Sequence, residues 1–187
     1  MMKKIEAVAV FCGSSTGKEE QYVTTAKQLG ERIAKEGITL VYGGAEIGVM
    51  GAVANGVLSL DGEVVGVIPQ FLKSKEIVHP ELTRLYTTEN MHQRKEKLQE
   101  LSDGFIVLPG GFGTLEELFE VISWAQLKLH SKPIGLLNID GFYNHLLKLM
   151  EDMMAKGFLR KEGYDLLLVD DTVEGLLRKM QDFNSVK

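Results

Sequence analysis

The chain has 187 residues, of which 44% are hydrophobic, and this predicts a single globular domain over residues 1–187 with a sizeable core. Its net charge of −5, without a basic tract, argues against a general nucleic-acid binder and against a membrane-surface protein. No stretch approaches the roughly 18 consecutive apolar residues that span a bilayer, and the one cysteine, Cys12, excludes an internal disulfide framework and indicates a reducing cytoplasm.

Short β-rich runs alternate with longer helical patterns along the chain. The N-terminal apolar run passes directly into a Gly-Ser turn, which predicts a first strand and not a signal peptide. The predicted strands are 7–12, 38–43, 63–68, 83–88, 104–109, 133–138 and 165–170, and the predicted helices are 19–36, 49–60, 90–102, 114–129, 142–156 and 172–183. This alternation predicts a doubly wound, Rossmann-like α/β fold, in which a mainly parallel sheet of about seven strands is flanked by helices.

Three glycine-rich segments follow predicted strands. They are CGSSTG (12–17), YGGAEIGVMG (42–51) and PGGFGTLEE (109–117). Because ligands bind outside the carboxyl ends of parallel strands, these segments predict one shared crevice. The Gly-Lys-Ser/Thr triplet of a P-loop is missing, and Glu116 stands where a dinucleotide fingerprint starting at Gly111 needs its third glycine. A phosphate or nucleotide site is therefore favoured, and NAD binding is disfavoured.

The helix that follows the third glycine-rich segment carries two adjacent glutamates. Thr114 is its expected N-cap, so Glu116 and Glu117 fall in the first turn. Its expected buried face consists of Leu115, Leu118, Phe119 and Ile122. Acidic residues are common in a first turn because they offset the positive end of the helix dipole. A carboxylate beside a turn shaped for an anion is nevertheless costly unless it has a role, which makes Glu117 a candidate for chemistry.

The helix predicted at 90–102 places two cations, Arg94 and Lys95, on the stripe that should face the core. Burying them without partners would cost several kcal/mol, roughly. Two interpretations remain open. Either their aliphatic stems pass the edge of the core and the charged ends reach solvent, or both side chains point into the crevice and meet an anion, which would be a phosphate or Glu117.

The other reactive side chains form no recognised catalytic or metal motif. The four histidines are scattered without metal-ligand spacing, so no metal site is predicted. Cys12 is expected to be a small buried residue. Ser14 and Ser15 suit hydrogen bonds to a phosphate better than nucleophilic attack, because the chain has no Gly-x-Ser-x-Gly elbow.

Two motifs carry a family resemblance. Residues 109–117 match Pro-Gly-Gly-x-Gly-Thr-x-x-Glu in full, and residues 91–95 match Met-His-x-Arg-Lys. Together with the Gly-Ser-Ser loop at 13–15 and the 42–51 segment, they make the chain resemble the Lonely-guy family of cytokinin riboside 5′-monophosphate phosphoribohydrolases, including its bacterial members. The resemblance extends over about residues 7–160.

The resemblance implies hydrolysis of the N-glycosidic bond of cytokinin riboside 5′-monophosphates or AMP, which yields free base and ribose 5-phosphate. It also implies that the enzyme needs no cofactor and forms a homodimer with active sites near the interface. By position, Glu117 and Arg94 would be catalytic. The substrate-binding residues would be Gly13, Ser14, Ser15, Gly43, Gly44, Glu76, Arg94, Lys95, Gly110, Gly111, Phe112, Gly113, Thr114, Leu115 and Glu116.

Ala45 and Glu46 depart from the family pattern, in which small or hydroxyl residues are common at these positions. A carboxylate facing the phosphate would repel it, so either Glu46 points to solvent or the ligand lies elsewhere. Some family members carry a lysine-decarboxylase label, for which this chain offers no convincing Schiff-base lysine. The alternative function is a non-catalytic nucleotide or phospho-ligand binder built on the same fold.

Overall fold

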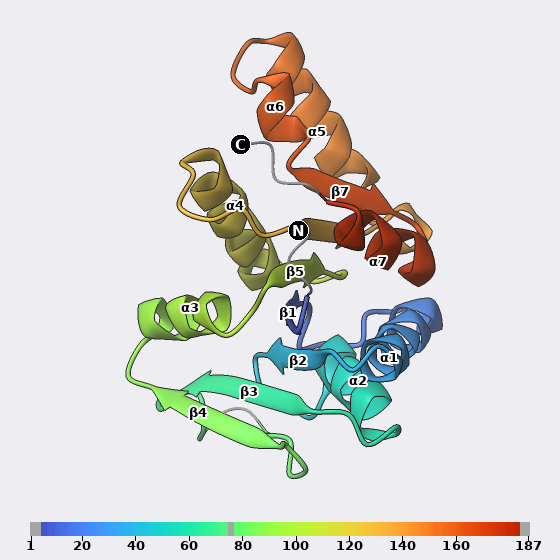
Figure 1. The fold of residues 1–187 in the computed structure, drawn as a ribbon, viewed down its shortest axis with the longest axis vertical. Coiled ribbons are helices and arrows are strands. Elements are labelled where there is room, and N and C mark those ends of the chain that lie inside the picture. Colours follow the sequence, from blue (N-terminus) through green and yellow to red (C-terminus); the bar gives the residue numbers. More distant parts are fainter. Residues whose placement is uncertain (1–4, 75–76, 184–187) are drawn as a thin grey trace.

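The computed structural model describes residues 5–74 and 77–183, and these contain a seven-stranded sheet (Figure 1). The strands are β1 (Ala7–Phe11), β2 (Thr39–Tyr42), β3 (Val64–Pro69), β4 (Arg84–Thr88), β5 (Gly104–Val107), β6 (Ile134–Leu137) and β7 (Leu167–Asp170). Neighbouring strands pair in parallel, in the order β4-β3-β2-β1-β5-β6-β7. The predicted parallel, Rossmann-like sheet is confirmed.

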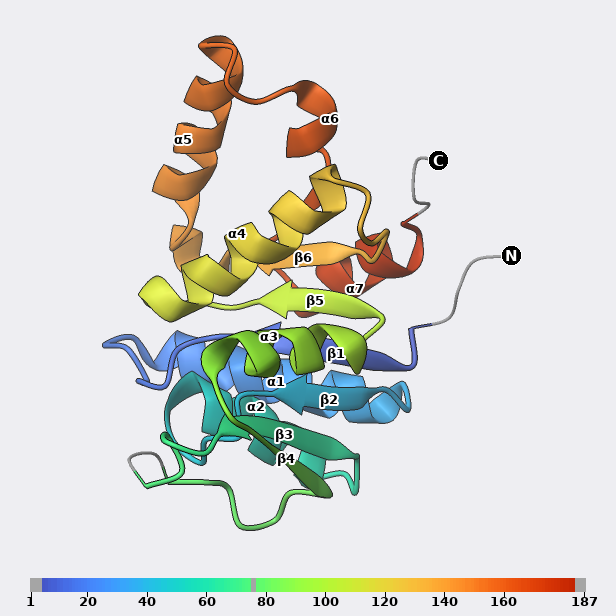
Figure 2. The same ribbon diagram turned by 90° about the vertical axis from the view of Figure 1, so that its left-hand side faces the viewer.

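Helices cover both faces of the sheet (Figures 1 and 2). One face carries α1 (Glu20–Lys35), α2 (Gly48–Leu58) and α7 (Val173–Gln181), and the other carries α3 (Met91–Glu100), α4 (Phe112–Gln126), α5 (Asn144–Ala155) and α6 (Lys161–Tyr164). The short α6 and the 3₁₀ turn η1 (Ile139–Gly141) were not predicted, because three or four residues are too few to show a hydrophobic period. In the part of the chain that the structure describes, no helix is long and apolar enough to cross a membrane.

The central strands are buried on both sides, which explains their uninterrupted apolar sequence. In β1, Val8 and Val10 belong to the core beneath α1, α2 and α7, whereas Ala9 and Phe11 belong to the core beneath α3, α4 and α5. The edge strand β4 has no buried residue: Arg84, Leu85 and Thr87 are exposed, and Tyr86 and Thr88 are partly exposed. Two-sided burial fixes β1 and β5 at the centre of the sheet, and the loops that follow them are held by that rigid frame.

The direction of winding reverses between β1 and β5. From β1 the chain builds β2, β3 and β4 to one side and then returns to place β5 on the other, with Phe11 in register with Val107. The loops that leave the carboxyl ends of these two strands diverge, and such a switch point is where open α/β sheets bind ligands.

Candidate active site

The three glycine-rich segments meet at the carboxyl edge of the sheet. After β1, the N–H of Gly13 donates to the carbonyl of Pro109, which follows β5, at 3.1 Å. At the start of α2, which follows β2, the N–H groups of Val49 and Met50 donate to the carbonyls of Ser15 and Gly13, each at 3.2 Å. The structure therefore brings the three segments together, as a shared crevice requires.

The two helices that begin at this edge differ in what their first turns offer to a ligand. The start of α2 is occupied, because its N–H groups donate to the loop after β1. The start of α4 is open: within residues 5–74 and 77–183, the N–H groups of Phe112, Gly113 and Thr114 have no hydrogen-bond acceptor. Free N–H groups at the positive end of a helix dipole bind anions. The start of α4 is thus the candidate phosphate site.

Helix α4 begins earlier than the sequence predicts. Gly111 is its N-cap, so the prediction that Thr114 caps the helix is wrong, and Glu116 and Glu117 lie in the second turn and not in the first. Thr114 is buried, and its side chain lies against Gly110 so closely that a Cβ there would collide with the hydroxyl. Because the dipole effect fades beyond the first turn, it does not account for Glu117.

The buried face of α4 also differs from the predicted one in part. Leu118 and Ile122 are buried as predicted, and Leu115 is partly buried. Phe119 is 38% exposed, so its predicted place in the core is wrong, and Val121 occupies that core instead. The buried side of α4 is therefore made by Leu118, Val121 and Ile122.

Arg94 is buried on α3, and backbone carbonyls satisfy much of its guanidinium. Nε donates to the carbonyl of Val67 in β3, and Nη2 donates to the carbonyl of Gly43 after β2, both at 3.1 Å. A Cβ at position 43 would collide with Nη2, so this approach requires glycine. The predicted place of Arg94 on the core-facing stripe is confirmed. The hydrogen bonds to the two carbonyls offset the cost of burying its charge.

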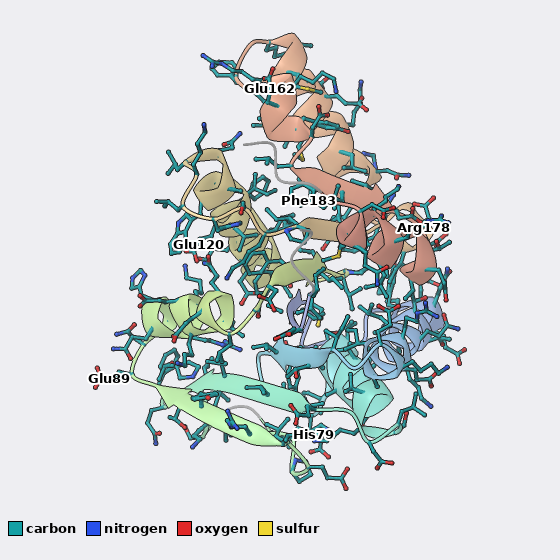
Figure 3. All side chains as sticks on the ribbon, viewed as in Figure 1. His79, Glu89, Glu120, Glu162, Arg178 and Phe183 are labelled. Carbon is teal, nitrogen blue, oxygen red and sulfur yellow. The ribbon has the colours of Figure 1, made fainter. Side chains whose placement is uncertain are left out.

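Lys95 is also buried, and its partners are carboxylates of α4. Its Nζ lies 2.5 Å from Oε1 of Glu116 and 2.7 Å from Oε2 of Glu120. The second oxygen of Glu120, which Figure 3 labels, accepts a hydrogen bond from the side chain of Gln99, at 3.0 Å. Lys95 does meet anions, as one of the two interpretations holds, and its partners are Glu116 and Glu120 and not Glu117.

Glu117 lies between these groups without a direct partner. Glu117 is half-buried, and in the described parts of the chain it forms no hydrogen bond or ion pair. Burial raises the pKa of Glu117 to about 7; Glu116 and Glu120 push it in the same direction, and Arg94 and Lys95 oppose them. A half-buried carboxyl group whose pKa lies near neutral pH, on the helix whose start is open, can exchange a proton with a substrate or with water.

The other predicted site residues are distributed as follows. Ser14, Ser15, Gly111, Phe112 and Gly113 are exposed, and Gly43 and Gly44 are buried. Glu76 lies outside the described residues. Glu46 is exposed, which agrees with the first of the two interpretations of this residue, and Cys12 is buried and free, as predicted.

Sequence reasoning missed three residues that organise this site. Gln99 and Glu120 follow Lys95 and Glu116 at i+4, so each pair lies on one face of its helix, and this spacing was a signal that could have been used. Tyr143 donates from its hydroxyl to the carbonyl of Leu108, at 2.7 Å, directly before the Pro-Gly-Gly turn. No sequence pattern reveals that contact, because its acceptor is a backbone atom.

An open helix start and a titratable carboxyl group at the switch point of a parallel sheet define a nucleotide-binding type of α/β protein.

Comparison with known proteins identifies the family within this class. A family model described as "Possible lysine decarboxylase" matches residues 50–180. The probable cytokinin riboside 5′-monophosphate phosphoribohydrolase LOGL5 of Oryza sativa subsp. japonica is 43% identical, over 96% of this chain and 73% of that protein.

The cytokinin riboside 5′-monophosphate phosphoribohydrolase LOG3 of Arabidopsis thaliana is 42% identical, over 96% of this chain and 84% of that protein. The chain therefore belongs to the Lonely-guy family of cytokinin riboside 5′-monophosphate phosphoribohydrolases. Among solved structures, the molybdenum cofactor binding protein of Rippkaea orientalis has a TM-score of 0.70 at 23% identity and 94% coverage of each chain. That likeness shows a shared fold.

Proposed function

We propose that this protein hydrolyses the N-glycosidic bond of nucleoside 5′-monophosphates, AMP or cytokinin riboside 5′-monophosphates, to free base and ribose 5-phosphate. One observation carries the proposal: Glu117, with a pKa of about 7 and no direct partner, lies on the same helix as the open anion site at its start. The activity named for relatives that are about 42% identical over most of the chain supports it.

The spacing along α4 suits a phosphoribosyl group. The phosphate would accept hydrogen bonds from the N–H groups of Phe112, Gly113 and Thr114, with Ser14 and Ser15 on the neighbouring loop as further donors. Glu117 lies about one turn, or roughly 5 Å, further along the helix axis than these donors. A ribose bridges a comparable gap between its 5′-phosphate and its anomeric carbon. A bound nucleotide would therefore bring that carbon close to the carboxyl group.

The chemistry of Glu117 follows from how a ribosyl C–N bond breaks. Positive charge develops on the sugar as the base departs, and an ionised carboxylate nearby stabilises that charge. The carboxylate also takes a proton from the attacking water as the new C–O bond forms, and that proton can pass to the departing base. Activity needs ionised Glu117, so kcat/KM should rise as the pH increases through about 7.

The site does not suit amine chemistry on a lysine, which the description of the family model would suggest. Although burial lowers the pKa of Lys95, its hydrogen bonds to Glu116 and Glu120 outweigh that effect and raise it above the usual value. A Schiff-base lysine needs the opposite shift, since only the neutral amine attacks a carbonyl.

The direct test is to incubate the purified protein with AMP and with isopentenyladenosine 5′-monophosphate and to follow the free base by chromatography. Adenosine is the matched control, because it has the same glycosidic bond without the phosphate. We expect base from both monophosphates and little or none from adenosine. Tight binding of AMP with no release of adenine would contradict the proposal and identify a non-catalytic binder.

We also infer that the protein is a cytoplasmic homodimer. The lone, reduced Cys12 is consistent with that compartment. Exposed apolar side chains on and after α4 and α5 support self-association; they are Phe112, Phe119, Leu127, Leu129, Leu149 and Phe158. Figure 2 shows α5 projecting away from the sheet, and Leu149 on this helix is 54% exposed. Sedimentation should give a dimer at micromolar concentration, and a monomer there would argue against the inference.

A further inference from the structure

A second layer of charged and polar side chains connects the two helices that carry the proposed catalytic groups. Arg94 is on α3 and Glu117 is on α4. Glu120 connects the helices through both of its oxygens, because Oε2 pairs with Lys95 at 2.7 Å and Oε1 accepts from Gln99 at 3.0 Å. Figure 3 shows Glu120 on the side of α4 that lies next to α3.

The same network extends beyond the two helices. The backbone carbonyl of Gln99 accepts a hydrogen bond from Nζ of Lys132, at 2.5 Å, in the segment between α4 and β6. The end of α3 is therefore attached both to the body of α4 and to the chain that follows it. Gln99 and Lys95 are buried, and the side chain of Glu120 is only 21% exposed, so solvent screens these contacts weakly.

We propose that Glu120 is a positioning residue for the hydrolysis. Glu120, anchored by Gln99, holds α3 against α4 and so fixes the positions of Arg94 and Lys95 relative to Glu117. This inference rests on the proposed function. Glu120 is three residues, a little under one turn, beyond Glu117 and pairs with Lys95, so it acts on the reaction through its neighbours and not through contact with the substrate. A small displacement of a catalytic group lowers turnover strongly, which is why such an anchor matters.

The network also sets the charge around Glu117. The charged and titratable groups that face Glu117 are Arg94 and Lys95 from α3, Glu116 and Glu120 from α4, and the Cys12 thiol after β1. Glu120 raises the pKa of Glu117. Removing its charge should lower that pKa, so Glu117 would stay ionised at lower pH. The acidic limb of the kcat/KM profile would then move to lower pH.

Three variants separate positioning from charge. Glu120→Gln removes the charge, and kcat/KM for AMP should fall by on the order of tenfold or more while the acidic limb moves to lower pH. Gln99→Leu removes the anchor but no charge, so kcat/KM should fall by less and the limb should stay in place. Glu100→Gln is the matched control: it removes an exposed ion pair with Lys97 from α3 and should leave both quantities unchanged.

The inference is overturned if folded Glu120→Gln and Gln99→Leu both keep kcat/KM within about twofold of the wild type. If Glu120→Gln does not fold, the result for Gln99→Leu decides. If the wild type releases no base, the proposed function fails. NMR titration of the Glu117 carboxyl carbon then tests independently whether Glu120 acts on the ionisation of Glu117. Glu120→Gln should then shift that titration to lower pH and Glu100→Gln should not, and an unshifted titration would overturn the inference.

Discussion

Glu117→Gln is expected to lower kcat for release of adenine from AMP by two to four orders of magnitude, roughly, which is the usual contribution of a positioned acid or base. The amide keeps the shape of the side chain but cannot stabilise the developing positive charge as a carboxylate does, and it cannot take a proton from water. The residual rate should also lose its rise through pH 7, because the group whose pKa is about 7 is gone.

Glu117→Gln should lower the rate of the chemical step without weakening the binding of AMP. The phosphate site at the start of α4 is retained, and one negative charge is removed from its neighbourhood, so AMP should bind as tightly as before or more tightly. Isothermal titration together with the chromatographic assay would measure both quantities. Glu46→Gln is a suitable control, since it removes the same charge from an exposed position on the loop after β2. A kcat within about tenfold of the wild type would remove Glu117 from the centre of the mechanism.

The fold was predictable because its signals are local and repeated. Uninterrupted apolar runs such as 104–109 reflect burial on both faces, and the glycine-rich segments mark the ends of β1, β2 and β5. The parallel connection rules then bring those ends to one edge of the sheet. Sequence reasoning therefore predicted a shared crevice, and it correctly placed Arg94 and Lys95 on the core-facing stripe of their helix.

The partners of those cations were not predictable, because they depend on tertiary packing. Arg94 donates to carbonyls of β3 and of the loop after β2, and a backbone acceptor leaves no mark in the sequence. Lys95 pairs with Glu116 and Glu120 only because α3 and α4 lie side by side on one face of the sheet.

The start of α4 shows how a local rule can fail. Threonine can cap a helix with its hydroxyl oxygen, which glycine lacks. Thr114 nevertheless lies inside the helix with its hydroxyl buried against Gly110, and Gly111 takes the capping position. The failure has a functional consequence, since glycine leaves the first N–H groups of α4 without a side-chain acceptor. A capping threonine would use one of the donors that the phosphate needs.

Arg94→Ala is expected to lower kcat/KM for AMP by about 100-fold or more, and it should also destabilise the fold. The carbonyls of Val67 and Gly43 would lose their donor, and a buried side chain would leave a space behind. We expect a loss of roughly 2–4 kcal/mol in the free energy of unfolding, measured as a lower urea midpoint. Arg94→Lys separates the two effects, because it retains the charge but cannot donate to both carbonyls in the same geometry.

The pH profile distinguishes a chemical role of Arg94 from a purely structural one. Arg94 lowers the pKa of Glu117, so its removal should raise that pKa and move the acidic limb of kcat/KM to higher pH. Loss of Glu120 should move the same limb to lower pH, because Glu120 acts on Glu117 with the opposite sign. Arg94→Lys should leave the limb nearer to its original position than Arg94→Ala does. Opposite shifts would show that both residues act on the ionisation of Glu117. If folded Arg94→Ala keeps kcat/KM within about twofold of the wild type, Arg94 has no part in the mechanism.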